Sequence, residues 1–336
     1  MRALVPLCAL LVLAFPAQAQ TPSSKFEISL PIDCELGVDC WFMNYTDHDA
    51  AEGSAKDAAC NARTYDAHKG TDIAVRDWGE ANSGVDVLAI APGKVLRLRD
   101  GEPDSFKTRE EFAAISEAKK DCGNGLIIDH GQGWISQYCH LKNGSFKVNA
   151  GDSVTRGKPL AEVGMSGVTE HPHVHVSVIH EEKIIDPFTG RATDTACGLD
   201  DAKPLWGSNE ITYTPFSLYD GGFDIKEPDF AATARGQRGA QPRRNSPALL
   251  FWTSYFGAEA GDIITLEMRQ PDGTVFAEQT ITQDKTRARQ YYFIGRKAPE
   301  VGFARGTWKA TATVTRKGAE GTPDQTSTLT RAIDVF

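Results

Sequence analysis

Residues 168–176 read Val-Thr-Glu-His-Pro-His-Val-His-Val, so that His173 and His175 alternate with valines. β-Branched residues favour strands, and residues two apart in a strand project from the same face of a sheet. The alternation therefore predicts a strand that presents both imidazoles on one face. Such a pair by itself is more often a surface or hydrogen-bonded pair than a metal site. A metal site at this strand requires further ligands from elsewhere in the chain.

A second pair of ligand-type side chains lies upstream, where residues 68–72 read His-Lys-Gly-Thr-Asp. Gly70 and Thr71 disfavour a helix, and the Ile-Ala-Val run that follows favours a strand. A strand would place residues 68, 70 and 72 on one face, with Gly70 leaving space between His68 and Asp72. The chain contains no His-Glu-x-x-His motif, so a glutamate base carried by a helix is not available.

Together these two segments offer a set of metal ligands. His68, Asp72 and one imidazole of the 173/175 pair would supply two nitrogens and one oxygen and would leave a fourth position open. Such a set is typical of a catalytic zinc site, whereas structural zinc sites are closed and rich in cysteine. Zinc would activate a water molecule and polarise an amide carbonyl. The other histidines near it would then accept a proton and donate to the developing oxyanion.

Four short motifs follow one another along the chain. They are His-Lys-Gly-Thr-Asp at 68–72, Gly-Asn-Gly at 123–125 with Ile-Asp-His-Gly at 128–131, Tyr-Cys-His-Leu at 138–141, and Pro-His-Val-His at 172–175. Between the last two, residues 148–154 read Val-Asn-Ala-Gly-Asp-Ser-Val. The whole, roughly residues 65–187, resembles the lysostaphin-type (LytM-like, Gly-Gly endopeptidase) zinc metallopeptidases, which cut peptidoglycan cross-bridges. Four motifs in the same order are far more specific than any one of them.

The resemblance implies a role for each candidate site residue. His68, Asp72 and His175 are expected to bind one Zn²⁺ per chain. His140 and His173 are expected to be the catalytic histidines. The fold implied is mainly β, with an antiparallel lysostaphin-like peptidase domain of the duplicated-hybrid-motif type.

The chain departs from the family pattern at a few positions. His171 stands where glycine is usual, Val174 replaces leucine, and Val176-Ser177 replaces Phe-Glu. None of these changes removes a ligand, but His171 would either crowd the substrate groove or add a polar contact. Tyr65 is a candidate oxyanion donor by its proximity to the first motif alone.

The three other histidines are interpreted as structural. His48 in the N-terminal part of the chain and His180 in a predicted turn are expected at the surface. His130 precedes a glycine-rich hairpin turn and is expected to fix that turn.

The length of 336 residues suffices for two domains. Residues 1–20 combine a positive start, an apolar core and an Ala-Gln-Ala cleavage site, which predicts a signal peptide. We expect an N-terminal extension at 21–64, the zinc peptidase domain at 65–199 and a linker at 200–210. Residues 211–336 contain short strand-like runs, beginning at 211–218, that predict a seven-stranded immunoglobulin-like β-sandwich. This half has no histidine, and no chemistry is expected in it.

The cysteines indicate an oxidising compartment. Loss of the signal peptide would leave six, an even number that is typical of disulfides in exported proteins. A hairpin through Gly-Gln-Gly at 131–133 would bring Cys122 near Cys139 and predicts that bridge. Cys34–Cys40 would close a short loop, and Cys60–Cys197 then follows by elimination.

Residues 105–120 predict a helix inserted between strands. Thr108 and Glu111 fit a capping box, and Phe112 and Ile115 give a narrow apolar stripe. The helix would either wall the substrate groove or lie on the surface, and the sequence leaves both alternatives open.

Net charge and hydropathy indicate which classes of partner are disfavoured for this chain. The formal net charge of −9 argues against nucleic acid. The basic cluster at 235–244, which includes Arg238, lies in a Gly/Gln/Pro-rich stretch and is interpreted as a solvated linker or loop. No apolar run after the predicted signal peptide is long enough to cross a membrane, so we expect no membrane anchor and export to the periplasm rather than the medium. A protein partner for the sandwich stays open.

Three functions are compatible with these residues. The first is an exported zinc metalloendopeptidase that hydrolyses amide bonds in peptidoglycan stem peptides or cross-links. The second is a non-catalytic wall-binding protein or an activator of another wall hydrolase; loss of ligand positions would favour it, and here all five are filled. The third is a biotinyl or lipoyl carrier, whose hairpins residues 91–95 and 151–160 resemble, but its Met-Lys-Met and Asp-Lys-Ala motifs are absent.

Overall fold

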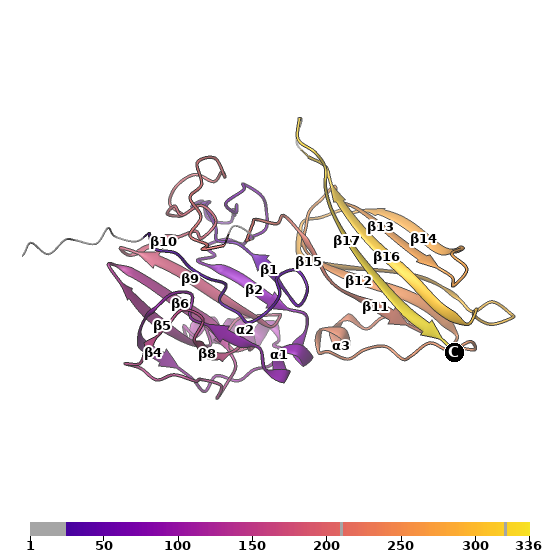
Figure 1. Cartoon of the computed structure of the whole chain (residues 1–336), viewed down its shortest axis with the longest axis horizontal. Coiled ribbons are helices and arrows are strands. Elements are labelled where there is room, and N and C mark those ends of the chain that lie inside the picture. The colour runs from indigo at the N-terminus through magenta and orange to yellow at the C-terminus, as the bar shows by residue number, and fades with distance from the viewer. Residues whose placement is uncertain (1–24, 209–210, 319–320) are drawn as a thin grey trace, which may run out of the picture.

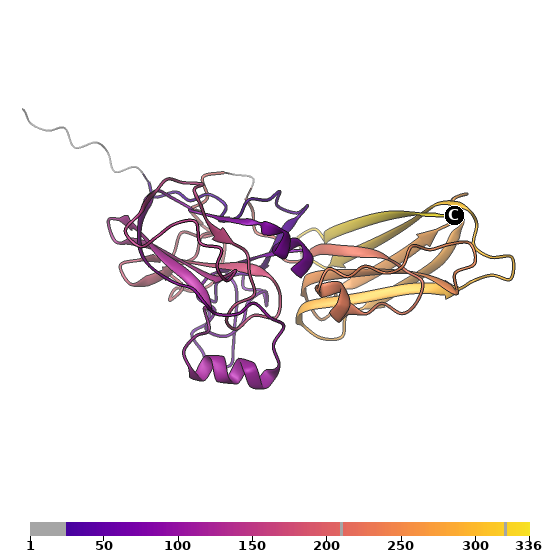
Figure 2. The ribbon, with the colours of Figure 1, turned by 90° about the horizontal axis from the view of Figure 1, so that it is seen from below.

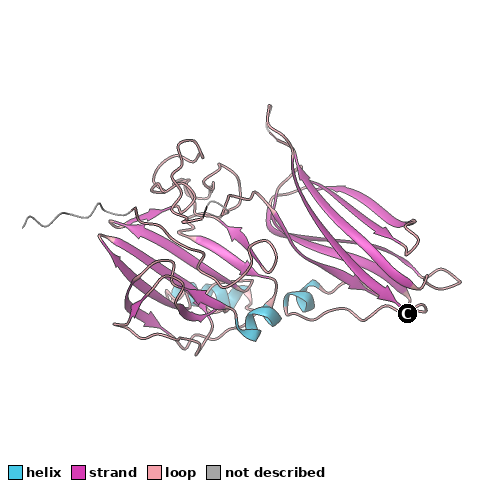
Figure 3. Ribbon diagram, viewed as in Figure 1, coloured by secondary structure: helices cyan, strands magenta, loops and turns pink. Residues whose placement is uncertain are grey.

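The computed structural model describes residues 25–208, 211–318 and 321–336. The predicted signal peptide at 1–20 and residues 209–210 of the predicted linker lie outside these residues. The described chain forms two β-rich bodies that lie side by side (Figure 1), and its helices are few and short (Figure 3). As predicted, the fold is mainly β with antiparallel sheets. Across the described ranges, no helix has both the length and the apolar character needed to span a membrane.

An eight-stranded antiparallel sheet forms the centre of the first body. Its order is β1 (Cys40–Asn44), β2 (Thr71–Val75), β9 (His173–His180), β6 (Trp134–Leu141), β5 (Asn124–Gly131), β4 (Gly93–Arg99) and β7 (Ser153–Val154), with β10 (Lys183–Ile185) also paired to β9. A small second sheet pairs β3 (Asp86–Leu88) with β8 (Pro159–Glu162). Buried aliphatic side chains from both sheets, such as Ile73, Val174 and Val87, share one core. This core holds the central strands rigidly in place.

The register of the central strands gathers the predicted site. On β2 and β9, Asp72 pairs with His175 and Ala74 pairs with His173. On the far side of β9, Cys139 of β6 pairs with His175. Asn44 of β1 pairs with Asp72. Four adjacent strands therefore meet at one place in the sheet.

The strand expected at residues 68–72 begins later than predicted. β2 starts at Thr71, and His68 lies in the preceding loop, so that it does not share a strand face with residue 72. Ala67 has a φ of 60°, and the His68 amide donates to the Tyr65 carbonyl at 3.0 Å. This turn reverses the chain just before the strand, and no pattern of residue types had indicated it.

The helix predicted within 105–120 is present as α2 (Arg109–Glu117). Its capping box is formed as expected, since the Glu111 amide donates to Thr108 Oγ1 at 3.3 Å and the Thr108 amide donates to Glu111 Oε2 at 2.7 Å. The helix buries no residue and projects from the first body (Figure 2). Phe112 nevertheless lines a cavity beside Asp72. This placement favours the groove-wall alternative.

All three predicted disulfides are formed. They join Cys34 to Cys40, Cys122 to Cys139 and Cys60 to Cys197. The last spans 137 residues and ties the N-terminal extension to the segment that follows β10. A bridge that closes so long a loop restricts the unfolded chain more than the two short ones do.

Seven strands in two sheets form the second body. The first sheet has the order β11 (Ser217–Asp224), β12 (Ala248–Ala258), β15 (Arg287–Lys297), and the second has the order β14 (Val275–Thr282), β13 (Ile263–Arg269), β16 (Gly306–Arg316), β17 (Gln325–Val335). Side chains from both, including Trp308 and Phe251, share one core. This is the predicted immunoglobulin-like sandwich, except that the fourth strand pairs with the third, whereas in constant-type immunoglobulin domains it pairs with the fifth. A short helix, α3 (Phe230–Ala234), lies between β11 and β12.

The first sandwich strand begins later than the expected 211–218. β11 starts at Ser217, because the preceding residues are bonded to the first body instead. The Tyr213 hydroxyl donates to Asp57 Oδ2 at 2.8 Å, and the Thr214 amide donates to the Tyr45 hydroxyl at 3.0 Å. Tertiary hydrogen bonds thus override the strand propensity of this segment.

An apolar cluster joins the two bodies. Trp41 and Ala74 of the first sheet pack with Tyr219 and Phe256 of the sandwich, and all four are buried. The rings of Tyr219 and Phe256 stack with centroids 4.0 Å apart, and Trp41 meets Tyr219 edge-on at 6.0 Å. The sandwich is therefore packed directly against the sheet edge that carries β1 and β2.

Two arginines add polar links across the same junction. Arg63 of the first body donates to Ser217 Oγ at 3.3 Å. Arg238 pairs with Asp220 at 3.1 Å and with Asp77, the N-cap residue of α1 (Trp78–Gly84). The segment around Arg238 is a loop, which is one of the two predicted alternatives, and the Arg238 guanidinium also bridges two carboxylates from different bodies.

Candidate metal centre

Three of the predicted site residues converge where β2 meets β9. Nε2 of His68 lies 3.1 Å from Oδ1 of Asp72 and 3.1 Å from Nδ1 of His175. Nδ1 of His175 lies 2.8 Å from the same Asp72 oxygen. The loop before β2 therefore delivers His68 to the pair that the strand register had already brought together.

These three atoms are arranged as metal ligands. In the described chain, one other group of His, Cys, Asp or Glu has comparable spacing, around Cys34 and Cys40, but those cysteines form a disulfide. Around a zinc ion with bonds near 2.1 Å, tetrahedral ligand atoms lie about 3.4 Å apart, slightly more than the 2.8 to 3.1 Å of the observed triangle. The three atoms are two imidazole nitrogens that face each other and one carboxylate oxygen. A divalent cation can bind all three at once, whereas a proton cannot.

Neighbouring groups orient two of these ligands. His68 donates from Nδ1 to the Tyr45 carbonyl at 2.6 Å, which leaves Nε2 with a lone pair toward the centre. Asn44 donates from Nδ2 to Oδ2 of Asp72 at 2.9 Å, which leaves Oδ1 for the centre. Such partners hold ligands in one orientation and are typical of metal sites. The sequence had not indicated Asn44, because its role depends on the pairing of β1 with β2.

The third ligand, His175, is held by its own strand. Its Nε2 lies 3.0 Å from Oγ of Ser177, so Nδ1 is the atom that faces the centre. Gly70 is required beside it, because a Cβ at that position would lie 2.6 Å from Nε2 of His175. The space predicted at Gly70 is thus used by the imidazole. Ser177, noted only as a departure from the family pattern, is the hydrogen-bond partner that the sequence analysis missed.

His173 borders the centre on the β9 side. Its Nδ1 lies 2.8 Å from the His171 carbonyl and 3.0 Å from Oγ1 of Thr169. A carbonyl can only accept, so Nδ1 carries the proton. Nε2 lies 3.5 Å from Oδ1 of Asp72. This places the second nitrogen of the ring beside the ligands without making it one of the three.

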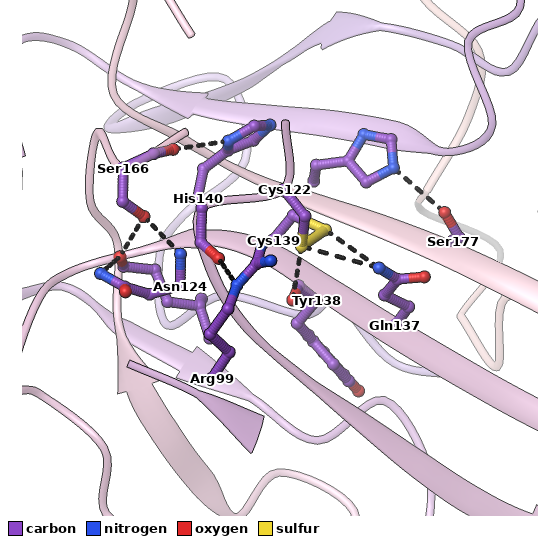
Figure 4. Close-up of a disulfide and its surroundings, with 12 residues drawn as sticks. Arg99, Cys122, Asn124, Gln137, Tyr138, Cys139, His140, Ser166 and Ser177 are labelled. Atoms are coloured by element: carbon purple, nitrogen blue, oxygen red, sulfur yellow. Dashed lines mark hydrogen bonds between the residues drawn. A yellow bond between two sulfur atoms is a disulfide. The ribbon is translucent and has the colours of Figure 1, made fainter. Parts of the chain in front are cut away.

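His140 borders the centre on the β6 side. Its Nδ1 is 2.8 Å from the Ser166 carbonyl (Figure 4). Its ring centroid is 4.6 Å from that of His173. The residue has a φ of 62°, a left-handed conformation that is costly for a side chain with a Cβ. Its amide donates to the Cys122 carbonyl at 2.9 Å, and the Cys122–Cys139 disulfide lies next to it. The bridge and the two hydrogen bonds together hold His140 in place.

Burial and mutual interaction shift the protonation of the cluster. Burial opposes ionisation of Asp72, but His68 and His173 outweigh it and hold the pKa of Asp72 well below its usual value. Burial likewise opposes a charge on His68, but Asp72 outweighs it and raises the pKa of His68. For His140, burial and the nearby His173 hold the pKa well below its usual value. The carboxylate is thus ionised and His140 is neutral near pH 7.

Comparisons with known proteins concern the same segment of the chain. Residues 66–187 match the model of peptidase family M23. The matched segment is a little over a third of the chain, and it is called the M23 domain below. All five predicted site residues lie within it.

Two curated proteins and one solved structure illustrate what the M23 domain is similar to. Cell division protein DipM of Caulobacter vibrioides is 26% identical over 112 residues, which are 33% of this chain and 17% of DipM. An uncharacterized metalloprotease of Haemophilus influenzae is 24% identical over 136 residues, 40% of this chain and 23% of that protein. The lysostaphin catalytic domain of Staphylococcus simulans is 20% identical, with a TM-score of 0.26 over 43% of this chain and 89% of that one. The chain spans less than a quarter of the length of either curated relative.

His48 is not part of the candidate centre and is not at the surface as predicted. It is buried, with Nε2 3.1 Å from Oδ2 of Asp186 and Nδ1 3.3 Å from the Thr195 carbonyl. The prediction failed because the partner is a residue 138 positions away that no local pattern connects to His48.

The two remaining histidines stabilise the β5–β6 region of the M23 domain. His180 is the last residue of β9 and stacks on Trp134 with centroids 4.1 Å apart, so it is only partly exposed. His130 lies 2.8 Å from the Pro92 carbonyl through Nδ1 and 2.8 Å from Oγ of Ser136 through Nε2. The second contact crosses the hairpin, in agreement with the predicted role of His130.

Two hollows flank the candidate centre. One, of about 460 Å³, is lined by His68, His140 and His175. The other, of about 370 Å³, is lined by Asp72 and His173. Tyr65 lines both, with its ring stacked on His68 at a centroid distance of 4.2 Å. A substrate that occupied both hollows would cross the centre.

Proposed function

We propose that this chain is an exported zinc metalloendopeptidase that hydrolyses amide bonds in peptidoglycan stem peptides or cross-links. The observation that carries the proposal is the convergence of Nε2 of His68, Oδ1 of Asp72 and Nδ1 of His175 within 3.1 Å of one another. Membership of the segment in peptidase family M23 supports the reaction class.

His68, Asp72 and His175 would hold the metal. A bound zinc ion supplies a Lewis acid that polarises an amide carbonyl and acidifies water. His140 and His173 each donate from Nδ1 to a backbone carbonyl, so Nε2 is the atom that can accept the proton of the attacking water and return it to the leaving amine. After it takes up a proton, the same Nε2 can donate to the oxyanion of the tetrahedral intermediate.

The substrate and location rest on composition and similarity. The three disulfides fit an oxidising compartment, and the acidic chain fits a partner other than nucleic acid. We therefore propose the periplasm as the site of action and peptidoglycan as the substrate. A protein partner of the sandwich would act on a surface other than the one packed against the M23 domain.

Digestion of purified sacculi tests the proposal when it is combined with zinc analysis of the same preparations. The mature chain should release soluble fragments and contain one zinc per chain. His175→Ala should lose both properties, and His140→Ala should keep zinc but release no fragments. Mass spectrometry of the products then identifies the bond that is cut.

His180→Ala serves as the matched control, because His180 lies on the same strand as His175 but contacts Trp134 and the Gln132 carbonyl instead of the centre. It should release fragments at the rate of the unmodified chain. Equal release by all four proteins, or by none of them in the presence of zinc, would refute the proposed function.

A further inference from the structure

The sandwich supplies one wall of the cavity next to the M23 site. Arg289 of β15 and its neighbour Ala288 line the 370 Å³ cavity together with Asp72 and His173. The rest of the lining is largely apolar and includes Phe112 of α2. A residue of the sandwich, which contains no histidine, thus lines the same cavity as two residues of the candidate centre.

His171 holds the Arg289 side chain in this wall. Nε2 of His171 lies 2.9 Å from the Val75 carbonyl and therefore donates, so Nδ1 must accept, and it lies 2.8 Å from Nη1 of Arg289. The ring also meets Phe256 edge-on with centroids 5.4 Å apart. The polar contact predicted for His171 is thus made with the sandwich, and it fixes the guanidinium at the border of the cavity.

The charge of Arg289 is left uncompensated. Its hydrogen-bond partners are uncharged: they are the His171 imidazole, whose pKa burial and the guanidinium itself hold well below its usual value, and the Tyr219 hydroxyl, whose pKa is raised by burial. In the described parts of the chain, no carboxylate oxygen lies within 4.0 Å of the guanidinium. Glu170 lines the same cavity, but it is an exposed residue that stays outside this distance. Arg238, by contrast, is paired with two carboxylates.

An oriented, unpaired guanidinium in a largely apolar cavity is suited to one kind of ligand group. Arginine binds carboxylates through two parallel hydrogen bonds, and such charge-assisted bonds are strong where water is partly excluded. Peptides of the cell wall carry free carboxylates close to their amide links. A carboxylate in this cavity would place a neighbouring amide of the same peptide beside Asp72 and His173.

We propose that Arg289 determines substrate specificity by binding a free carboxylate of the peptide next to the scissile amide. The inference rests on the proposed function and deepens it, since it assigns to the sandwich a contribution to the M23 site. The site is complete as a substrate-binding site only when both bodies are docked. On this proposal the sandwich, in which no chemistry was expected, contributes to substrate binding.

Muropeptide dimers from a muramidase digest test this assignment, used as isolated and after carbodiimide-driven amidation of their carboxyls with ammonia. The full chain should cleave the free-carboxylate dimers with a kcat/KM about 10- to 100-fold above that for the amidated dimers. Arg289→Gln should bring this ratio close to one, and Arg289→Lys should restore part of it. Arg287→Gln removes the same charge from an exposed position on the same strand and should leave the ratio unchanged.

Binding separates this inference from the proposed function. Calorimetric titration of the same dimers into His140→Ala should show a Kd that rises about tenfold or more on amidation, and the added Arg289→Gln change should remove this difference. If the unmodified chain cleaves neither dimer, the proposed function fails and the titration alone decides on Arg289. Equal cleavage of both dimers by the unmodified chain, or an equal loss on both with Arg289→Gln, would overturn the inference.

Discussion

Two buried histidine–aspartate pairs in this molecule have the same length and different surroundings. His68 and Asp72 are 3.1 Å apart, and so are His48 and Asp186. All four side chains are almost fully buried. By distance and burial alone, the two pairs are indistinguishable.

The difference lies in what the histidine nitrogens and carboxylate oxygens face next. Both nitrogens of His48 face oxygens, on Asp186 and on the Thr195 carbonyl, so a protonated ring satisfies the whole arrangement. Nε2 of His68 faces a second imidazole nitrogen on His175 as well as the carboxylate. The first pair is therefore closed by protons, whereas the second has the geometry that a cation with several coordination positions would complete.

Removal of the carboxylate in each pair is the sharpest test of this comparison. We expect Asp72→Ala to lower the zinc content from one per chain to near zero. The rate of hydrolysis should fall by more than the roughly 10- to 100-fold that is typical when a residue hydrogen-bonded to a metal ligand is lost. Metal analysis and fragment release measure both effects. Asp186→Ala is the matched control and should retain zinc; if it loses zinc as Asp72→Ala does, the distinction between the pairs is wrong.

The same substitution at Asp186 should instead weaken the fold. Removal of one partner from a buried pair costs about 3–5 kcal/mol in the free energy of unfolding. Asp186 also accepts the amides of Phe188 and Thr189 at 2.6 and 3.1 Å, so the cost should lie toward the upper end. Urea unfolding with intact disulfides measures it. A loss below about 1 kcal/mol would show that the pair is not structural.

Loss of a side chain that is hydrogen-bonded to a candidate ligand should have an intermediate effect on zinc affinity. Ser177→Ala removes the hydroxyl that orients His175 and should weaken zinc binding by about 10- to 100-fold. Competition with a chelator of known affinity measures the change. Ser83→Ala, which removes a hydroxyl bonded to the Glu80 carbonyl on α1, should leave zinc affinity as it was. Identical affinities for both variants would mean that Ser177 plays no part at the centre.

The smallest expected effect concerns pH. Burial opposes a charge on His48, but Asp186 outweighs it and raises the pKa of His48 above 6.5. The stability that this pair adds is therefore fully present below pH 6.5 and is lost as the pH rises through the raised value.

His48→Gln should accordingly cost more stability at pH 6 than at pH 9. The difference should be on the order of 1 kcal/mol, the size of one hydrogen bond. Unfolding in the presence of a chelator keeps zinc out of the comparison. A cost that grew with pH would contradict the assigned direction.

The sequence alone determined which donor atoms the chain possesses and in which order. Motif order identified all three residues that converge, although the reasoning that placed His68 on a strand was wrong. The hairpin that joins Cys122 to Cys139 and the capping box of α2 were also predictable, because hairpins and caps are set by residues close in the chain.

Only the tertiary structure decided which side chains meet, both at the candidate site and away from it. Asn44 reaches Asp72 across a strand pair, Asp186 reaches His48 across 138 positions, and Arg289 reaches His171 from the other body. Each contact depends on strand register or on the docking of the sandwich, and neither leaves a periodic signal in the chain. Residue types therefore specified the chemistry available. Packing between distant segments decided that the His68–Asp72 pair borders a cavity and that the His48–Asp186 pair is closed.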